Sequence, residues 1–89
     1  LNYSVAELGF PVVKEGIYAF DDVPFSYIIK KLELYYDITI IQKNKKLDQY
    51  RFSGKFRQRD GVESVLQTLQ KVYYFSFVKD EENNCITIR

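Results

Sequence analysis

The stretch FSYIIKKLELYYDITI, residues 25–40, decides the fold because its apolar pattern returns 37 residues later as VESVLQTLQKVYYFSF, residues 62–77. In each copy, apolar residues first follow the i, i+3, i+4, i+7 spacing of a helix and then alternate with other residues, as in a strand. The sequence therefore predicts two helix–strand units of the same kind within one small domain.

Length and composition set the scale of this domain. The chain has 89 residues, 46% of them hydrophobic, which suffices for one domain with a modest core. Gly9 and Pro11 interrupt the start of the chain, so residues 1–15 are predicted to be a linker or the tail of a preceding domain. Residues 16–89 are predicted to form a single α+β domain, with two βαβ-type repeats, two helices packed on small β-sheets and a C-terminal hairpin.

Acidic residues before the helices and polar stretches between the apolar patterns indicate where the individual elements begin and end. Asp21 and Asp22 are expected to cap the first helix, and Asp60 with Glu63 has the spacing of a capping box for the second. Residues 42–49 and 79–84 are polar and are expected to be loops. The predicted strands are 17–20, 38–41, 50–57, 74–78 and 85–88, and the predicted helices run from about Pro24 to Tyr36 and from about Gly61 to Val72 or Tyr73.

Basic residues are concentrated in the middle of the chain. Residues 43–59 carry seven Lys or Arg and only one acid, Asp48. In residues 50–57 the basic side chains alternate with aromatic ones, so the predicted strand has one basic and one apolar face, and Gly54 marks a bulge or the close approach of another backbone or ring. The basic face is interpreted as a solvated edge or as a binding surface, and both readings stay open.

Residues that carry out catalysis are scarce. The chain has no His, which removes the commonest general base and zinc ligand, and its four glycines do not form a phosphate-binding loop. Cys85 is the only cysteine and falls in an alternating strand, where a structural thiol is expected. The acidic residues 80–82 lack the alternating spacing of a calcium loop. We therefore predict that the domain is not an enzyme and has no cofactor or metal site.

Five segments of the chain together form a recognisable pattern. They are Gly16-Ile17-Tyr18-Ala19-Phe20, Val23-Pro24-Phe25, the apolar residues from Ile28 to Ile40, Phe52-Ser53-Gly54-Lys55-Phe56 and Ile86-Thr87-Ile88. This pattern resembles the C-terminal domain of FecR-type anti-sigma factors, whose fold is similar to the secretin and TonB-receptor N-terminal signalling domain. The resemblance covers residues 13–89, with Val13 in place of a frequent Trp and Phe25 in place of the more usual Leu.

The resemblance implies a role in signalling. It predicts a periplasmic domain of an inner-membrane-anchored protein, which relays the state of an outer-membrane TonB-dependent transporter to a cytoplasmic sigma factor. The implied partner is the N-terminal signalling domain of the transporter, bound by strand addition or contact at a sheet edge. The sigma factor would be reached through other parts of the parent protein. No nucleic acid and no direct membrane contact are expected of this domain.

Two sets of residues are candidates for partner binding. The basic strand face, Arg51, Lys55 and Arg57, would steer association. Tyr27 and Tyr35 fall off the main apolar stripe of the first helix and are candidate aromatic anchors, and Tyr18 and Tyr74 are weaker ones.

Two alternative functions are open. One is a secretin or TonB-receptor N-terminal signalling domain itself, which has the same fold. The other is a small nucleic-acid-binding αβ module. The second is weakened because Phe52 and Phe56 lie on the strand face opposite the basic residues, so base stacking and phosphate contacts would not coincide.

Overall fold

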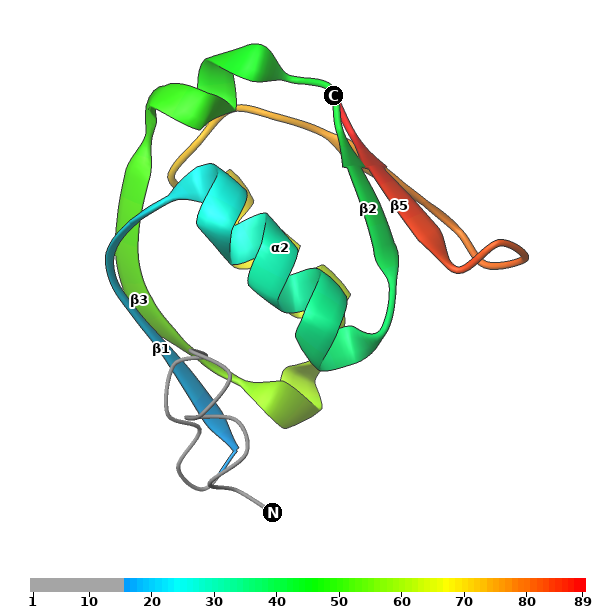
Figure 1. Cartoon of the computed structure of the whole chain (residues 1–89), viewed down its shortest axis with the longest axis horizontal. Coiled ribbons are helices and arrows are strands. Elements are labelled where there is room, and N and C mark those ends of the chain that lie inside the picture. Colours follow the sequence, from blue (N-terminus) through cyan, green and yellow to red (C-terminus); the bar gives the residue numbers. More distant parts are fainter. Residues whose placement is uncertain (1–15) are drawn as a thin grey trace.

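The computed structural model describes residues 16–89, in which two helices lie between two small β-sheets. Figure 1 shows α2 crossing the middle of the molecule, with β1 and β3 on one side and β2 and β5 on the other. The predicted α+β class is confirmed. The elements are β1 (Ile17–Pro24), α2 (Phe25–Tyr36), β2 (Thr39–Gln42), the 3-10 helix η1 (Lys45–Gln49), β3 (Arg51–Arg57), the 3-10 helix η2 (Gln58–Asp60), α3 (Gly61–Gln70), β4 (Phe77–Asp80) and β5 (Cys85–Ile88).

The two sheets reflect the internal repeat. The strands that precede the helices, β1 and β3, pair antiparallel in a two-stranded sheet. The strands that follow the helices, β2 and β4, flank β5, which runs parallel to β2 and antiparallel to β4. Each repeat thus contributes one strand to each sheet, and β5 is an addition to the second copy.

The core lies where the apolar faces of the two helices meet. The first four apolar positions of each helical stripe are buried. Burying each such side chain stabilises the fold by about 1.5–3 kcal/mol before the entropy of ordering is subtracted. These residues are Phe25, Ile28, Ile29 and Leu32 in α2, and Val62, Val65, Leu66 and Leu69 in α3.

The predicted cap of the first helix is wrong. Pro24 is the N-cap of α2 and no side chain bonds the free N–H groups there. Asp21 and Asp22 belong instead to β1, which runs four residues further than predicted and contains a bulge between Phe20 and Val23. Asp22 has a φ of 51° at this bulge, a conformation that Asp and Asn tolerate better than most residues. Asp22 therefore belongs to the strand bulge, and α2 begins directly after Pro24, whose partner in the ladder is Arg51.

The predicted capping box of the second helix is also wrong. The helix begins at Gly61, as expected, but neither Asp60 nor another side chain makes a capping bond. The Glu63 carboxylate turns away and lies 3.4 Å from the ammonium of Lys79 on β4. A contact to a distant strand has replaced the local one.

The segment after α3 differs from the prediction. The helix ends at Gln70, so Val72 lies outside it and is 60% exposed. Regular β4 begins at Phe77 and not at residue 74. The last strand, Cys85–Ile88, is confirmed. The polar connection over residues 42–49 contains η1, whose Leu47 is buried, an anchor that the sequence analysis missed.

The predicted linker over residues 1–15 lies outside the described residues.

Candidate partner-binding surface

Strand β3 has the two faces that its alternation predicts. Arg51, Lys55 and Arg57 are exposed on the outer face. On the inner face, Phe52 and Phe56 stack on each other with ring centroids 5.7 Å apart. The aromatic rings are thus separated from the basic groups by the strand itself, and the geometry disfavours a nucleic-acid platform that combines stacking with phosphate contacts.

Arg51 is bound within the molecule. Its Nε donates to Oδ1 of Asp22 at 2.9 Å and its Nη2 donates to the carbonyl of Asp22 at 2.7 Å. The amide of Asp22 in turn donates to Oγ of Ser53 at 2.8 Å. Both charged side chains are more than half exposed, so the ion pair adds at most about 1 kcal/mol to stability. Its main effect is to fix the bulge of β1 against β3.

Lys55 and Arg57 differ from Arg51. They lie across the ladder from Ala19 and Ile17, which carry no charge. Within residues 16–89, neither forms an ion pair. These two cations are therefore available to an acidic partner, whereas Arg51 would have to leave Asp22.

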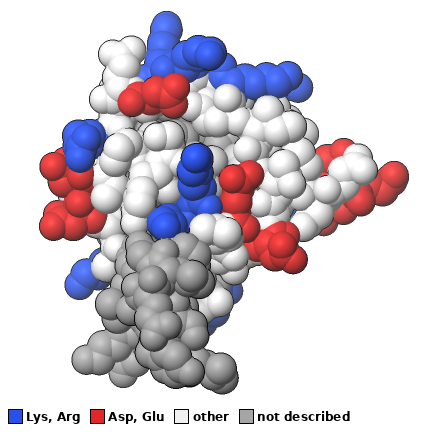
Figure 2. Space-filling view, viewed as in Figure 1, with Lys and Arg blue, Asp and Glu red and all other residues white. Residues whose placement is uncertain are grey.

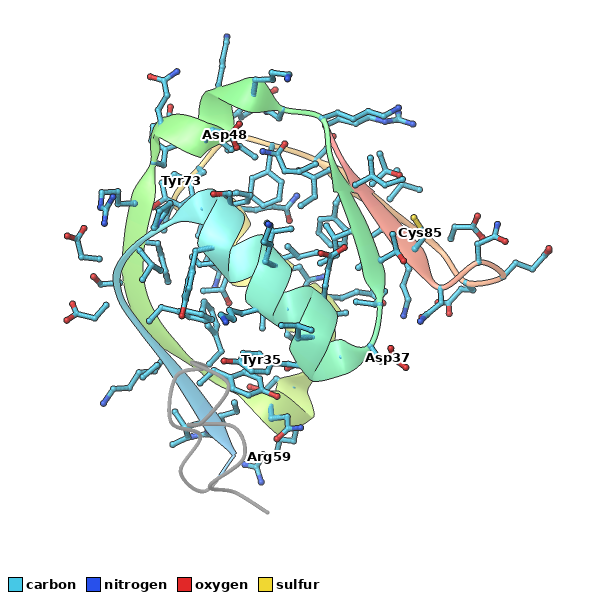
Figure 3. All side chains as sticks on the ribbon, viewed as in Figure 1. Tyr35, Asp37, Asp48, Arg59, Tyr73 and Cys85 are labelled. Atoms are coloured by element: carbon cyan, nitrogen blue, oxygen red, sulfur yellow. The ribbon has the colours of Figure 1, made fainter. Side chains whose placement is uncertain are left out.

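The outer edge of β3 is partly open. Gln58 donates to the carbonyl of Gly16 at 2.7 Å, so by the antiparallel alternation the backbone groups of Lys55 and Arg57 point away from β1. Further along the edge, the Tyr73 hydroxyl, which lies beside β3 (Figure 3), donates to the carbonyl of Arg51 at 2.5 Å. A groove of about 200 Å³ follows the open part between β3 and α3. It is lined by Lys55, Phe56, Arg57, Asp60, Ser64, Val65 and Thr68.

The candidate tyrosines of α2 are half-buried at the edge of the core. Tyr27 meets Phe20 edge to face, and the ammonium of Lys31 lies 5.1 Å from its ring centroid. Tyr35, near the end of α2 (Figure 3), stacks on Tyr18 with centroids 4.0 Å apart. Each ring therefore offers only part of its surface, and a partner-binding role for Tyr27 and Tyr35 stays a prediction.

Tyr18 and Tyr74 lie at opposite extremes of solvent exposure. Tyr18 is 1% exposed and cannot be an anchor, which corrects that expectation. Burial, with a smaller contribution from the Tyr36 hydroxyl, raises the pKa of Tyr18 to about 12. Burial is also the main cause that raises the pKa of Tyr35. Tyr74 is 99% exposed and is the most exposed of the large hydrophobic residues that the structure describes.

Charge is unevenly distributed over the surface. Figure 2 shows Lys and Arg gathered at the top of the view, over η1, and acidic atoms at the tip on the right, where the β4–β5 turn projects. In that turn, the Asn83 side-chain amide donates to Asp80 at 2.7 Å and is the main cause that lowers the pKa of Asp80. The two ends of the second sheet thus present opposite charges to a partner.

The described part of the chain offers little for metal or thiol chemistry. Among residues 16–89, no three His, Cys, Asp or Glu side chains are grouped so that they could hold a metal ion. Cys85 is half-buried on β5 (Figure 3), with its sulfur 3.9 Å from the carbonyl of Ile86. None of the helices described here is long and apolar enough to cross a membrane.

The repeat architecture, with two helices between a two-stranded and a three-stranded sheet, defines a class of small α+β domains that present strand edges and charged faces. Comparison with protein families identifies the family itself. Residues 17–88 match the family described as FecR, C-terminal, and the chain belongs to it. The predicted family resemblance is confirmed.

Solved structures confirm the fold. A crystal structure at 1.65 Å of a proposed anti-sigma factor from Parabacteroides distasonis superposes with a TM-score of 0.71 at 23% identity, over 84% of this chain and 34% of the other. A second structure of such a protein from the same organism, at 2.50 Å, gives a TM-score of 0.70 at 23% identity, over 83% and 33%. The chain therefore spans about a third of the length of these proteins. No curated protein matches the chain significantly.

Proposed function

We propose that this domain is the periplasmic protein-binding module of an anti-sigma factor. It binds the N-terminal signalling domain of an outer-membrane TonB-dependent transporter, and its inner-membrane-anchored parent protein passes the signal to a cytoplasmic sigma factor. Membership of the FecR C-terminal family supports the anti-sigma part of this proposal, as does the description of the structural neighbours.

One observation carries the binding role: Lys55 and Arg57 are exposed cations without an ion pair in the described chain, on a strand whose outer edge opens into a groove. Unpaired surface charge next to free backbone groups suits an incoming acidic strand, because the charges speed the encounter and the backbone bonds hold the complex. Arg51 is a weaker candidate since its guanidinium already binds Asp22.

The test is a kinetic one. Lys55→Glu with Arg57→Glu should slow association with the transporter signalling domain of the native host at least about tenfold at low salt, and much less at physiological salt. Lys45→Glu with Lys46→Glu on η1 makes the same change of charge at a distance and is the matched control. Association rates measured by surface plasmon resonance that fall equally for both double variants would show that only net charge matters. Unchanged rates for both would remove β3 from the interface.

A further inference from the structure

The outer edge of β4 has free backbone groups. Ser76 and Arg89 exchange two backbone hydrogen bonds, of 3.2 and 2.9 Å. By the antiparallel alternation, Val78 also faces β5, and the N–H and C=O groups of Phe77 and Lys79 point away from the sheet. Within residues 16–89, no hydrogen bond reaches these four groups. They form a short template for an added strand.

On the opposite edge of the same sheet, a side chain binds one of the outward-facing backbone groups. On β2, the amide of Ile40 points away from β5 and donates to Oε2 of Glu33 at 2.7 Å. The internal repeat makes this contrast informative, because Glu33 and Ile40 correspond to Gln70 and Phe77, 37 residues on. Gln70 does not copy the arrangement: its Nε2 donates to the carbonyl of Phe75 at 3.0 Å and leaves the amide of Phe77 free. The second copy thus lacks the side-chain acceptor that binds a strand amide in the first copy.

Apolar surface accompanies the open edge. Val78 on β4, Thr87 on β5 and Ile41 on β2 are in register across the outer face of the sheet. Val78 is 54% exposed and Ile41 is 44% exposed. Both side chains are therefore more than two-fifths exposed on the face that β4 shares with β2. An added strand could pack its alternate side chains on this exposed apolar surface while its backbone pairs with the open edge.

The charges beside the edge select the occupant. Asp80, Glu81 and Glu82 lie at the end of β4, and Lys79 is the one cation that pairs with this group in the described chain. On the inner side, the ion pair between Lys79 and Glu63 holds α3 against β4. A partner that brought its own helix layer to this edge would meet α3, so a single extended strand fits better than a second copy of the domain.

We propose that the edge of β4 binds an extended polypeptide segment with apolar side chains at alternate positions and a basic residue that faces Asp80 to Glu82. This surface lies on the side of the molecule away from β3 (Figure 1), so the proposal does not depend on Lys55 and Arg57.

The probe is the peptide acetyl-Lys-Val-Thr-Val-Thr-Val-Lys-amide, added to the ¹⁵N-labelled 89-residue chain. Saturable shifts are expected at the amides of Phe77 and Lys79. At 10 mM peptide and a Kd near 1 mM, their hydrogen exchange should slow about tenfold, because protection follows one plus the ratio of ligand to Kd. The same peptide with its five internal amides N-methylated should not protect them.

The internal repeat suggests a substitution that tests whether the β4 edge binds the peptide. Gln70→Glu places at this edge the side chain that binds the Ile40 amide in the first copy, and should weaken peptide binding at least about fivefold. Gln67→Glu adds the same charge at an exposed position of α3 and should leave binding unchanged. Val78→Lys should also weaken binding, whereas Leu34→Ser, at an exposed apolar residue of α2, should not.

Three results would overturn the proposal. Protection at Ser53 and Lys55 in place of Phe77 and Lys79 would move the site to β3. Concentration-dependent broadening of Phe77 and Lys79 without peptide would assign the edge to a second copy of the chain. Equal binding of a peptide with Glu at both ends would remove the basic residue from the recognition. Each result can be told from a failure of the β3 interface, because Lys55→Glu with Arg57→Glu should keep peptide binding intact.

Discussion

Gly54→Ala tests how an aromatic ring covers the backbone of β3. A methyl group on Gly54 would lie 2.6 and 2.7 Å from Cε2 and Cζ of Phe52. The Phe52 ring cannot swing away freely, because it stacks on Phe56 and meets Tyr73 at a centroid distance of 6.3 Å. A ring folded over a strand glycine in this way is a known device for fixing register.

Two opposing effects determine how much Gly54→Ala changes the free energy of unfolding. Forcing an extra methyl into a packed site costs about 1–3 kcal/mol. Replacing Gly by Ala stabilises the fold by about 0.4–1 kcal/mol through the unfolded state, since the φ of Gly54 is not in the left-handed region. We expect a net loss of roughly 1–2 kcal/mol, and a fall in Tm of about 4–8 °C for each kcal/mol.

A double-mutant cycle isolates the ring as the cause. In a Phe52→Ala background the methyl group added at position 54 meets no ring, so Gly54→Ala should become neutral or stabilising. The coupling free energy between positions 52 and 54, measured by urea unfolding followed by circular dichroism, should therefore be roughly 1.5–3 kcal/mol. An equal loss of stability in both backgrounds would refute the role of the ring.

Three further predictions concern other contacts. Glu33→Ala leaves the partly buried Ile40 amide without an acceptor and should cost about 1–2 kcal/mol, seen in urea unfolding together with faster hydrogen exchange at Ile40. Tyr18 has a raised pKa, so its contribution to the free energy of unfolding is complete below the unfolded pKa near 10 and is lost as pH rises through about 12. Alkaline unfolding should coincide with its ionisation, followed by absorbance at 295 nm, a wavelength free of Trp absorbance in this chain. Tyr18→Phe should shift the unfolding transition to higher pH. Asp80 has a lowered pKa, so its contribution to the free energy of unfolding is present above the unfolded pKa near 3.9 and is lost as pH falls through the lower folded value. In thermal unfolding, Asp80→Asn should be less stable than the parent chain at pH 7 and equally stable near pH 2.

Periodicity predicted the helices well because their buried stripes are long and unambiguous. Ile28, Leu32, Val65 and Leu69 are all buried at the expected spacing. The alternating faces of β3 were predictable for the same reason. Such patterns record burial, and burial is what holds these elements in place.

The failures concern polar side chains that have both a local and a distant partner. Asp22 could have capped α2 but binds Arg51, 29 residues away, and Glu63 could have closed a capping box but faces Lys79. Sequence spacing weighs only the local option, because the distant one exists only after the strands have paired. The same limit applies to the basic residues of the candidate site. Arg51, Lys55 and Arg57 are equivalent in the sequence, and only the bulge of β1 separates the engaged arginine from the two available cations.

The internal repeat shows how the two copies come to differ at their sheet edges. Two equal helix–strand units would place β2 and β4 in equivalent positions, each with one edge outward. The addition of β5 between them pairs the inner edges, and the outer edges of β2 and β4 stay without a strand partner in the described chain. At the corresponding positions, Glu33 is an acceptor that reaches the strand amide, whereas the Gln70 amide group donates to the carbonyl of Phe75 and leaves the amide of Phe77 free. A single position in the repeat therefore decides whether the corresponding strand amide at the sheet edge has a side-chain acceptor.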